Sequence, residues 1–241
     1  MDQTPLKRPQ FFFTTAPMPC PYLDGRLERK IVTDLSGHGA DTVHDALSRA
    51  GFRRSHTIAY APACPDCQAC VPVRIVVDGF APKDTLRRIW NANQDLDADL
   101  LPATATAEQY HVFSRYQHCR HGDSDMALMG FFDYRSMVED SPIDTAMAEF
   151  RSPDGALLGA CLLDRMADGL SAVYSFFDPN VPTKRSLGTH MVLWMVSRAR
   201  AEGLGYVYLG YWIEESRKMA YKSRFRPLEA FGSEGWYRLR D

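Results

Sequence analysis

Residues 170–231 constrain the fold of this chain more than any other segment. Residues 171–177 are rich in β-branched and aromatic side chains, which is typical of a buried strand. A helix is predicted over residues 186–202, because Ser186 is a capping residue type and the apolar middle of this segment indicates burial. Residues 206–212 form a second short apolar run. A strand, a crossover helix and a strand predict parallel pairing in a right-handed unit.

Polar side chains follow the second of these strands closely. Ligands gather at the carboxyl ends of parallel strands, so we expect a binding site there. A helix begun near Glu214 would place Lys218 and Lys222 on one face, where two lysines can hold an anion. A solvated face with a Glu214–Lys218 pair is the alternative. The candidate residues of this segment are Tyr211, Trp212, Ser216, Lys218, Tyr221 and Lys222.

The whole chain has the composition of an ordinary globular protein, with 241 residues, 45% hydrophobic and 24% charged. Residues 94–106 are acidic and then rich in Pro, Ala and Thr, which favours a linker. We therefore predict an N-terminal domain over residues 1–100 and a C-terminal domain over residues 101–241. The net charge of −2 argues against a dedicated non-specific nucleic-acid binder. No apolar run approaches membrane-spanning length, so a cytoplasmic protein without a membrane partner is expected.

Four cysteines form a candidate metal site. Cys64, Cys67 and Cys70 follow one another with two-residue gaps, and Cys20 supplies a fourth soft ligand. Such a run in a cytoplasmic protein favours a zinc or iron–sulfur centre over a disulfide framework. The alternative is four reduced thiols in a Pro-rich loop. No organic cofactor is expected.

A longer pattern in residues 210–227 resembles a known family. The sequence Gly-Tyr-Trp-Ile-x-x-Ser-x-Lys-Met-x-Tyr-Lys-x-x-Phe-x-Pro resembles the C-terminal signature of the arginyl-tRNA–protein transferases, and within them the bacterial aspartate/glutamate leucyltransferase branch. Residues 20–26, 115–121 and 177–188 resemble further elements of the same family. Its eukaryotic members carry a cysteine-ligated centre, which supports the metal hypothesis. Residues 81–93 are less basic than the family pattern, which predicts weaker binding to a polyanion.

The resemblance implies a fold and a reaction. The fold is a mixed α+β or α/β structure, a GCN5-type acyltransferase-like mixed sheet with helices, beside a smaller N-terminal cysteine-containing domain. The reaction is that of an aminoacyltransferase, which moves leucine from Leu-tRNA to the N-terminal amine of proteins beginning with Asp or Glu. Such proteins are thereby marked for degradation through the N-degron (N-end rule) pathway. Leu-tRNA and acidic acceptor proteins are the implied partners.

Roles follow for residues of this sequence. Asp178, at a strand end, is expected to orient or deprotonate the amine, with Glu149 and Glu229 behind it. The Tyr221 hydroxyl or N–H groups near Gly210 are expected to stabilise the oxyanion. The remaining candidates bind substrate: Lys218, Lys222 and Arg54 the acidic side chain, Tyr211 and Trp212 the leucyl group or terminal adenine, and Ser216, Arg115 and Gln117 through the family motifs. His121 is either a base or phosphate donor, or a structural histidine at a helix end.

Three other functions stay open at this point. The same family transfers arginine from Arg-tRNA. A CoA-dependent N-acetyltransferase is suggested by residues 185–190, although His190 stands where that phosphate-binding loop requires a small residue. A non-catalytic, metal-bearing adaptor would leave the signature of residues 216–222 unused.

Overall fold

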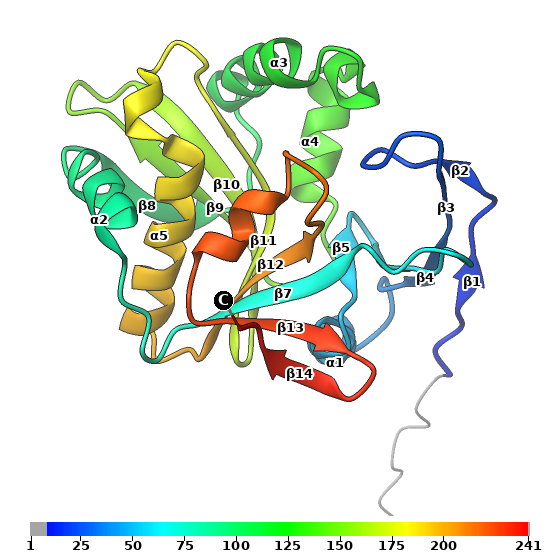
Figure 1. Ribbon diagram of the computed structural model, residues 1–241. Coiled ribbons are helices and arrows are strands. Elements are labelled where there is room, and N and C mark those ends of the chain that lie inside the picture. Colours follow the sequence, from blue (N-terminus) through cyan, green and yellow to red (C-terminus); the bar gives the residue numbers. More distant parts are fainter. Residues whose placement is uncertain (1–8, 241) are drawn as a thin grey trace, which may run out of the picture.

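The computed structural model describes residues 9–240, and an eight-stranded sheet forms its centre (Figure 1). The strand order is β14-β13-β7-β12-β11-β10-β9-β8. Every neighbouring pair is antiparallel except β11 and β12, which run parallel. The strands span Val71–Val76 (β7), Asp97–Pro102 (β8), Thr145–Arg151 (β9), Leu157–Met166 (β10), Gly169–Phe177 (β11), Tyr206–Trp212 (β12), Leu228–Gly232 (β13) and Gly235–Arg238 (β14).

A smaller antiparallel sheet, built from the first third of the chain, lies beside this centre (Figure 1). Its strand order is β1-β4-β6-β5, and β2 pairs separately with β3. The strands span Phe13–Thr14 (β1), Met18–Pro19 (β2), Leu27–Glu28 (β3), Lys30–Asp34 (β4), Arg53–Ser55 (β5) and Ile58–Pro62 (β6). Helix α1, Ala40–Arg49, connects β4 to β5.

Helices cover both faces of the large sheet. Leu187–Ala201 (α5) and Asp84–Asn91 (α2) pack on one face, where Met191, Leu193 and Met195 of α5 are almost fully buried. Ala107–His121 (α3) and Phe131–Glu139 (α4) cover the other face. Helix α3 begins with a capping box, in which Thr106 and Gln109 exchange hydrogen bonds. Short 3₁₀ turns span Asp125–Leu128 (η1), Thr183–Arg185 (η2) and Ala220–Arg224 (η3).

The predicted strand–helix–strand unit is confirmed. Strands β11 and β12 pair in parallel, and α5 crosses between them. The helix start differs from the prediction, because Ser186 has a positive φ of 46° and its hydroxyl donates to the Thr183 carbonyl instead of capping α5. The segment predicted as a linker contains the edge strand β8, which pairs with β9.

The helix predicted from Glu214 is absent from the described residues. The chain instead makes turns after β12 and then the short η3. Lys218 consequently is exposed whereas Lys222 is buried, so the two lysines do not share a helix face. The reason is tertiary, because the Lys222 ammonium turns inward and donates to the Tyr211 carbonyl.

The large sheet crosses the residue at which we placed a domain boundary. Strands β7 and β8 precede residue 101, yet β7 lies between β12 and β13, and β8 forms the edge beside β9. In residues 9–240 no helix combines the length and the apolar character that crossing a membrane requires.

Candidate active site where β11 and β12 separate

The two parallel strands pair over only three residues and then separate. Their ladder joins Gly169–Ser171 to Tyr206–Tyr208 and ends there. Each strand then carries a bulge, at Val173 in β11, two residues beyond Ser171, and at Leu209 in β12, one residue beyond Tyr208. A bulge adds an unpaired residue and bends its strand. The two bulges therefore turn the strands apart, and we call the region beyond Ser171 and Tyr208, where the two strands are no longer paired, the split.

Arg53 of β5 reaches into the split from the small sheet. Its guanidinium donates to the Ser171 hydroxyl at 3.2 Å and to the Ala172 carbonyl, both on β11. On the other strand it packs against Gly210, where a Cβ atom would lie 2.6 Å from Arg53 Nε. Gly210 also has a φ of +73°, a conformation that L side chains rarely adopt. Glycine is thus required at this position for its conformation and for the approach of Arg53.

Lys222 lies next to Arg53. Its side chain is buried, and its ammonium donates to the Tyr211 carbonyl at 2.6 Å. Burial, with a smaller contribution from the charge of Arg53, lowers the pKa of Lys222 to about 7, and Cys70 opposes the shift. Arg53 and Lys222 therefore contact consecutive residues of β12, Gly210 and Tyr211, in the split.

Tyr221 belongs to the same cluster. Burial raises its pKa to about 12, and Tyr116, Cys161 and Arg53 are the charged or polar neighbours that act on it. Its hydroxyl therefore stays protonated at neutral pH and can donate a hydrogen bond. The predicted oxyanion donor and the predicted anion-binding Lys222 are consequently close to one Arg53.

Asp178 lies at the carboxyl end of β11, as predicted. One carboxylate oxygen accepts from Arg115 of α3 at 3.0 Å, and the other accepts from the backbone N–H of Asn180 at 3.0 Å. Arg115 is half exposed, so this ion pair lies at the rim of the split. The structure thereby brings together two of the predicted site residues, from α3 and from β11.

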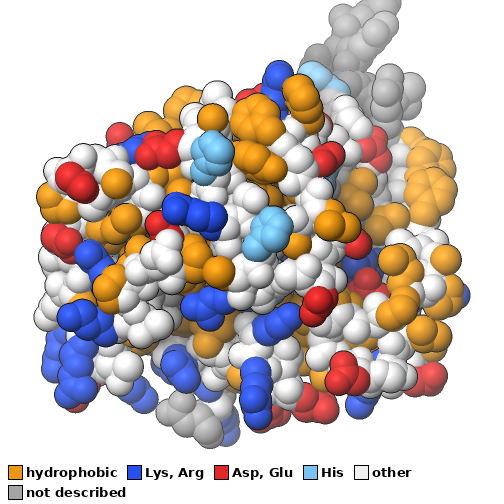
Figure 2. Space-filling view, turned by 90° about the horizontal axis from the view of Figure 1, so that it is seen from above, with side chains coloured by type: hydrophobic (Ala, Val, Ile, Leu, Met, Phe, Trp, Pro, Cys, Tyr) orange, Lys and Arg blue, Asp and Glu red, His pale blue; other side chains and the backbone are white. Residues whose placement is uncertain are grey.

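Basic side chains surround this rim. The charge of Lys218 helps to lower the pKa of His121 of α3, after burial as the main cause, so these two residues are neighbours. Figure 2, seen from above, shows Lys and Arg side chains distributed across this face of the molecule together with histidines. Exposed basic residues on the elements at the rim are Arg115, Arg120, Lys184, Arg217 and Lys218.

Other predicted substrate-binding residues are buried nearby. Gln117 of α3 is fully buried and donates to the Tyr174 hydroxyl of β11 at 2.6 Å, while its carbonyl oxygen has no partner in the described residues. The Trp212 indole N–H, at the end of β12, also lacks a partner there. Ser216 is buried in the turn after β12. The Tyr211 ring is buried under the small sheet, where its hydroxyl meets the carbonyls of Gly51 and Tyr60.

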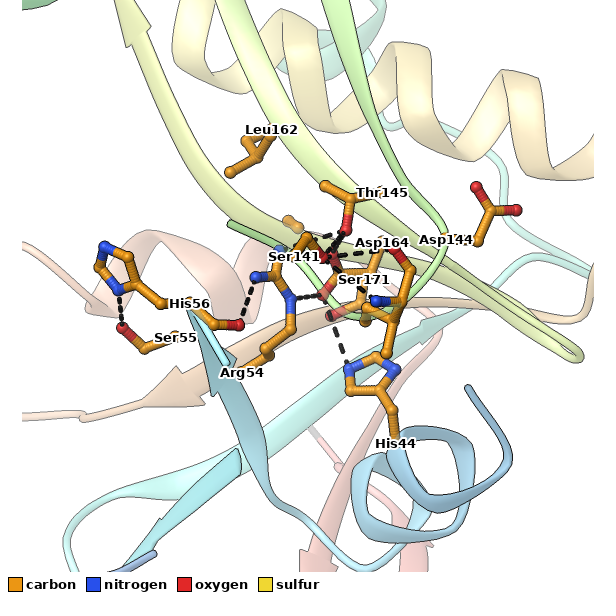
Figure 3. A network of polar contacts seen from close by, with 12 residues as sticks. His44, Arg54, Ser55, His56, Ser141, Asp144, Thr145, Leu162, Asp164 and Ser171 are labelled. Atoms are coloured by element: carbon orange, nitrogen blue, oxygen red, sulfur yellow. Dashed lines mark hydrogen bonds and ion pairs between the residues drawn. The ribbon is translucent and has the colours of Figure 1, made fainter. Parts of the chain in front are cut away.

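Arg54 lies outside the split, in a buried polar network between the two sheets (Figure 3). Its guanidinium donates to both oxygens of Asp164 of β10, at 2.9 and 2.7 Å, and to the His56 carbonyl. Thr145 donates to the same carboxylate at 2.8 Å. Because Asp164 already engages the guanidinium with two bonds, Arg54 is positioned to join the sheets and not to meet a substrate.

Glu149 and Glu229 also lie in structural networks. Glu149 of β9 is buried, where it accepts from Gln109 at 2.7 Å and from Arg151. Glu229 of β13 accepts from Arg74 at 2.9 Å, and the Arg74 guanidinium stacks on Tyr206. Within the described residues neither carboxylate shares a hydrogen bond or ion pair with Asp178, behind which the sequence places them.

The four cysteines gather in one region without forming a metal cage. Burial raises the pKa of Cys70 to about 11, and Cys20, Cys64 and Cys67 add to this shift, so the four thiols are neighbours. Arg26 donates to the Cys67 sulfur at 3.2 Å. Within residues 9–240, no group of three or more His, Cys, Asp or Glu side chains is arranged to hold a metal ion. The zinc or iron–sulfur centre stays a prediction.

Residues 185–190, which resemble a CoA-binding loop, make packing and polar contacts within the fold. Arg185 donates to Asn93 at 2.9 Å and pairs with Asp95, and the His190 ring packs near Trp90 and Phe150. Burial lowers the pKa of His190 to about 4, so its imidazole is neutral. These side chains fill the start of α5 where a phosphate would need access to N–H groups.

Arg53 is the residue that sequence reasoning missed. The pair Arg53-Arg54 was visible before a predicted strand, but the selected member was Arg54. Alternation along a strand indicates that two adjacent side chains point to opposite faces. It does not indicate which of the two faces the site, because that depends on how the small sheet packs on the large one.

Comparison with known proteins places the chain in a family. The family model "Arginine-tRNA-protein transferase, C terminus" matches residues 108–232, and "Arginine-tRNA-protein transferase, N terminus" matches residues 18–88. An aspartate/glutamate leucyltransferase of Paramagnetospirillum magneticum is 68% identical over 99% of this chain and 98% of its own length. That of Rhodospirillum rubrum is 65% identical over 98% of this chain and 96% of its own length.

Solved structures support the fold. FemX covers 87% of this chain and 71% of its own length with a TM-score of 0.52 and 10% identity, and L-PGS of Bacillus licheniformis covers 73% and 62% with a TM-score of 0.52 and 12% identity. The mixed sheet with helices on both faces is the predicted GCN5-type acyltransferase-like fold. Together with the sequence matches, this shows that the chain belongs to the arginine-tRNA-protein transferase family of aminoacyltransferases.

Proposed function

We propose that this protein transfers leucine from Leu-tRNA to the N-terminal amine of proteins that begin with Asp or Glu. The observation that carries the proposal is the 68% identity, over almost the whole length of both chains, to an aspartate/glutamate leucyltransferase. The added leucine would mark the acceptor for degradation as an N-degron. The geometry of the site supports this reaction.

The reaction needs no covalent enzyme intermediate. The acceptor's amine nitrogen attacks the ester carbon of leucyl-tRNA, and an amide bond forms. The ester bond to the terminal ribose breaks, the ribose oxygen leaves with a proton, and the amine loses one. An α-amine has an ordinary pKa near 8, so a sizeable fraction is already uncharged at neutral pH. Positioning of the two substrates is therefore the main task of the site.

The split is suited to hold the reacting ester. Strands β11 and β12 have no ladder pair beyond Ser171 and Tyr208, so their facing edges are not bonded to each other there. Backbone N–H groups on such an edge can donate to an oxyanion. The protonated Tyr221 hydroxyl is a further donor, either to the oxyanion or to the leaving ribose oxygen.

Asp178 is placed to orient the acceptor's amine. Each of its oxygens has one hydrogen bond, from Arg115 and from the Asn180 N–H. A carboxylate oxygen has a second lone pair, so both oxygens can still accept from an incoming amine. Arg115 holds the carboxylate at the rim of the split, where the amine must lie to reach an ester carbon inside it.

The basic rim suits the tRNA. The exposed Arg120, Lys184, Arg217 and Lys218 come from α3, the turn before α5 and the turns after β12. Cations in such positions attract phosphates. Their binding releases counterions from the RNA, so the affinity falls as the salt concentration rises. Acidic side chains lie on the same face (Figure 2), so the basic residues form local clusters and not a uniformly positive surface.

The experiment offers purified protein labelled Leu-tRNA, Arg-tRNA or acetyl-CoA, each with peptides that begin with Asp, Glu or Ala. We expect leucine on the Asp and Glu peptides and none on the Ala peptide. Arginine transfer would keep the family and overturn the proposed donor. Acetyl transfer, or no transfer from any donor, would overturn the proposed function.

A further inference from the structure

Two basic side chains lie in the split without a negative partner. Arg53 is half-buried and Lys222 is only 7% exposed. Within residues 9–240, neither side chain forms an ion pair, although thirteen other pairs are present there. The charges that act on Lys222 are those of Arg53 and Cys70, and no Asp or Glu of the described chain is among them.

The two cations are held in place by uncharged acceptors. Arg53 donates to the Ser171 hydroxyl and the Ala172 carbonyl, and Lys222 donates to the Tyr211 carbonyl. Each group keeps further N–H donors, since a guanidinium has five and an ammonium three. These bonds fix the position of the charges without neutralising them.

Such an arrangement costs stability when the site is empty. A buried charge without a partner is unfavourable, and two like charges repel each other. The chain nevertheless encloses both, and it needs glycine at position 210 so that Arg53 can approach β12. An incoming anion would offset this cost, which makes the pair a preorganised anion site.

We propose that Arg53 and Lys222 bind the side-chain carboxylate of the acceptor's N-terminal Asp or Glu. This inference rests on the proposed function, because it names the residues that select its acceptor. Arg53 and Lys222 contact residues within β11 and β12, whereas Asp178 comes after the last residue of β11, at the rim of the split. An acceptor residue can therefore place its amine at Asp178 and its side-chain carboxylate at Arg53 and Lys222. The site then selects the charge of the side chain and the orientation of the amine at the same time.

Burial favours a carboxylate over a phosphate of the tRNA. A phosphodiester carries a nucleoside on each side and is bound on open basic surfaces. Lys222 is almost closed to solvent, which disfavours a phosphate that carries a nucleoside on each side. Lys218, which we had ranked first for acid recognition, is exposed beside His121 and suits the tRNA instead.

The test compares the side chains Asp and Asn, which have nearly the same shape and differ in charge. We would measure kcat/KM for peptides beginning with Asp and with Asn at saturating Leu-tRNA, in the unchanged protein and in Arg53→Met, Arg53→Lys and Lys222→Met. Binding of the Asp peptide without tRNA is measured separately by fluorescence titration. The matched controls are Arg165→Met and Lys83→Met, because both side chains are exposed and lie outside the split.

We expect Arg53→Met and Lys222→Met each to lower the Asp/Asn ratio of kcat/KM by about tenfold to hundredfold, as loss of a charge-assisted hydrogen bond implies. Arg53→Lys keeps the charge and should retain part of the ratio, which guards against a variant that merely misfolds. The two controls should keep the full ratio.

Two outcomes would overturn the inference. One is an unchanged Asp/Asn ratio in both Met variants. The other is a loss of Leu-tRNA affinity with the ratio retained, which would assign the two cations to a phosphate. If the protein transfers no leucine at all, the proposed function fails. The peptide titration would still decide whether Arg53 and Lys222 bind an acidic N-terminus.

Discussion

Arg53 and Arg54 are adjacent in the chain and have opposite surroundings. Arg54 is buried and bonded through two nitrogens to Asp164, which joins the small sheet to the large one (Figure 3). Arg53 points to the other side of β5, meets only uncharged acceptors and lies in the split. Arginine thus holds the two sheets together at position 54, whereas at position 53 it keeps a charge without an ion-pair partner. What differs is the partner that the fold provides.

Arg54→Met should have the largest effect on stability. It leaves the Asp164 carboxylate buried without its cation, and breaking such a pair costs about 3–5 kcal/mol. Urea unfolding of Arg54→Met and Arg53→Met measures the contrast. Arg53→Met should cost clearly less, because it leaves no buried charge behind. Equal losses would show that the two arginines do not differ in the way described.

Gly210→Ala should have an intermediate effect on stability. It should disturb the position of Arg53 and leave the Arg54–Asp164 pair unchanged. Its methyl group would meet Arg53 Nε, and its positive φ adds strain of about 1–2 kcal/mol. Gly155→Ala is the matched control, since Gly155 also has a positive φ but a Cβ there would touch nothing within 4 Å. We expect Gly210→Ala to lower both the melting temperature and the Asp/Asn ratio, and Gly155→Ala to lower only the former. A retained ratio in Gly210→Ala would contradict the position of Arg53.

The smallest expected effect is a pH dependence on the Arg54 side. His44 Nε2 lies 3.6 Å from Asp164, yet burial, helped by Arg54, holds the pKa of His44 below its usual 6.5. The unfolded chain then binds a proton that the folded chain does not. The contribution of His44 to the free energy of unfolding is therefore fully present above pH 6.5. It is lost as the pH falls, by at most about 1.4 kcal/mol per pH unit.

His44→Gln should flatten this slope, as measured by urea unfolding between pH 7 and pH 5. The other groups that face His44 are Ser48, Asp45, Arg53, Arg54 and Asp164, and all stay in place in this variant. An unaltered slope would mean that another group, such as the buried His190, dominates the acid response.

Local patterns predicted most of the elements around the site. Residues 206–212 were predicted as a strand from their apolar run, and β12 spans the same residues. Two Asp-Gly pairs, at residues 154–155 and 168–169, are typical of tight turns between antiparallel strands, and they join β9, β10 and β11 into a meander. These predictions succeeded because periodicity and turn residues act over short distances along the chain. The predicted helix after Glu214 failed for the same reason, since the burial of Lys222 depends on distant residues.

The sequence by itself determined the family and the strand–helix–strand frame, because both depend on which residues follow one another. Only the tertiary structure decided which of the charged side chains have an ion-pair partner. It paired Arg54 with Asp164, 110 residues further along the chain, and placed Arg53 beside Gly210 and Lys222. An arginine's role follows from the groups that surround it in space. Those groups come from β10, β11, β12 and η3, which no local pattern brings together.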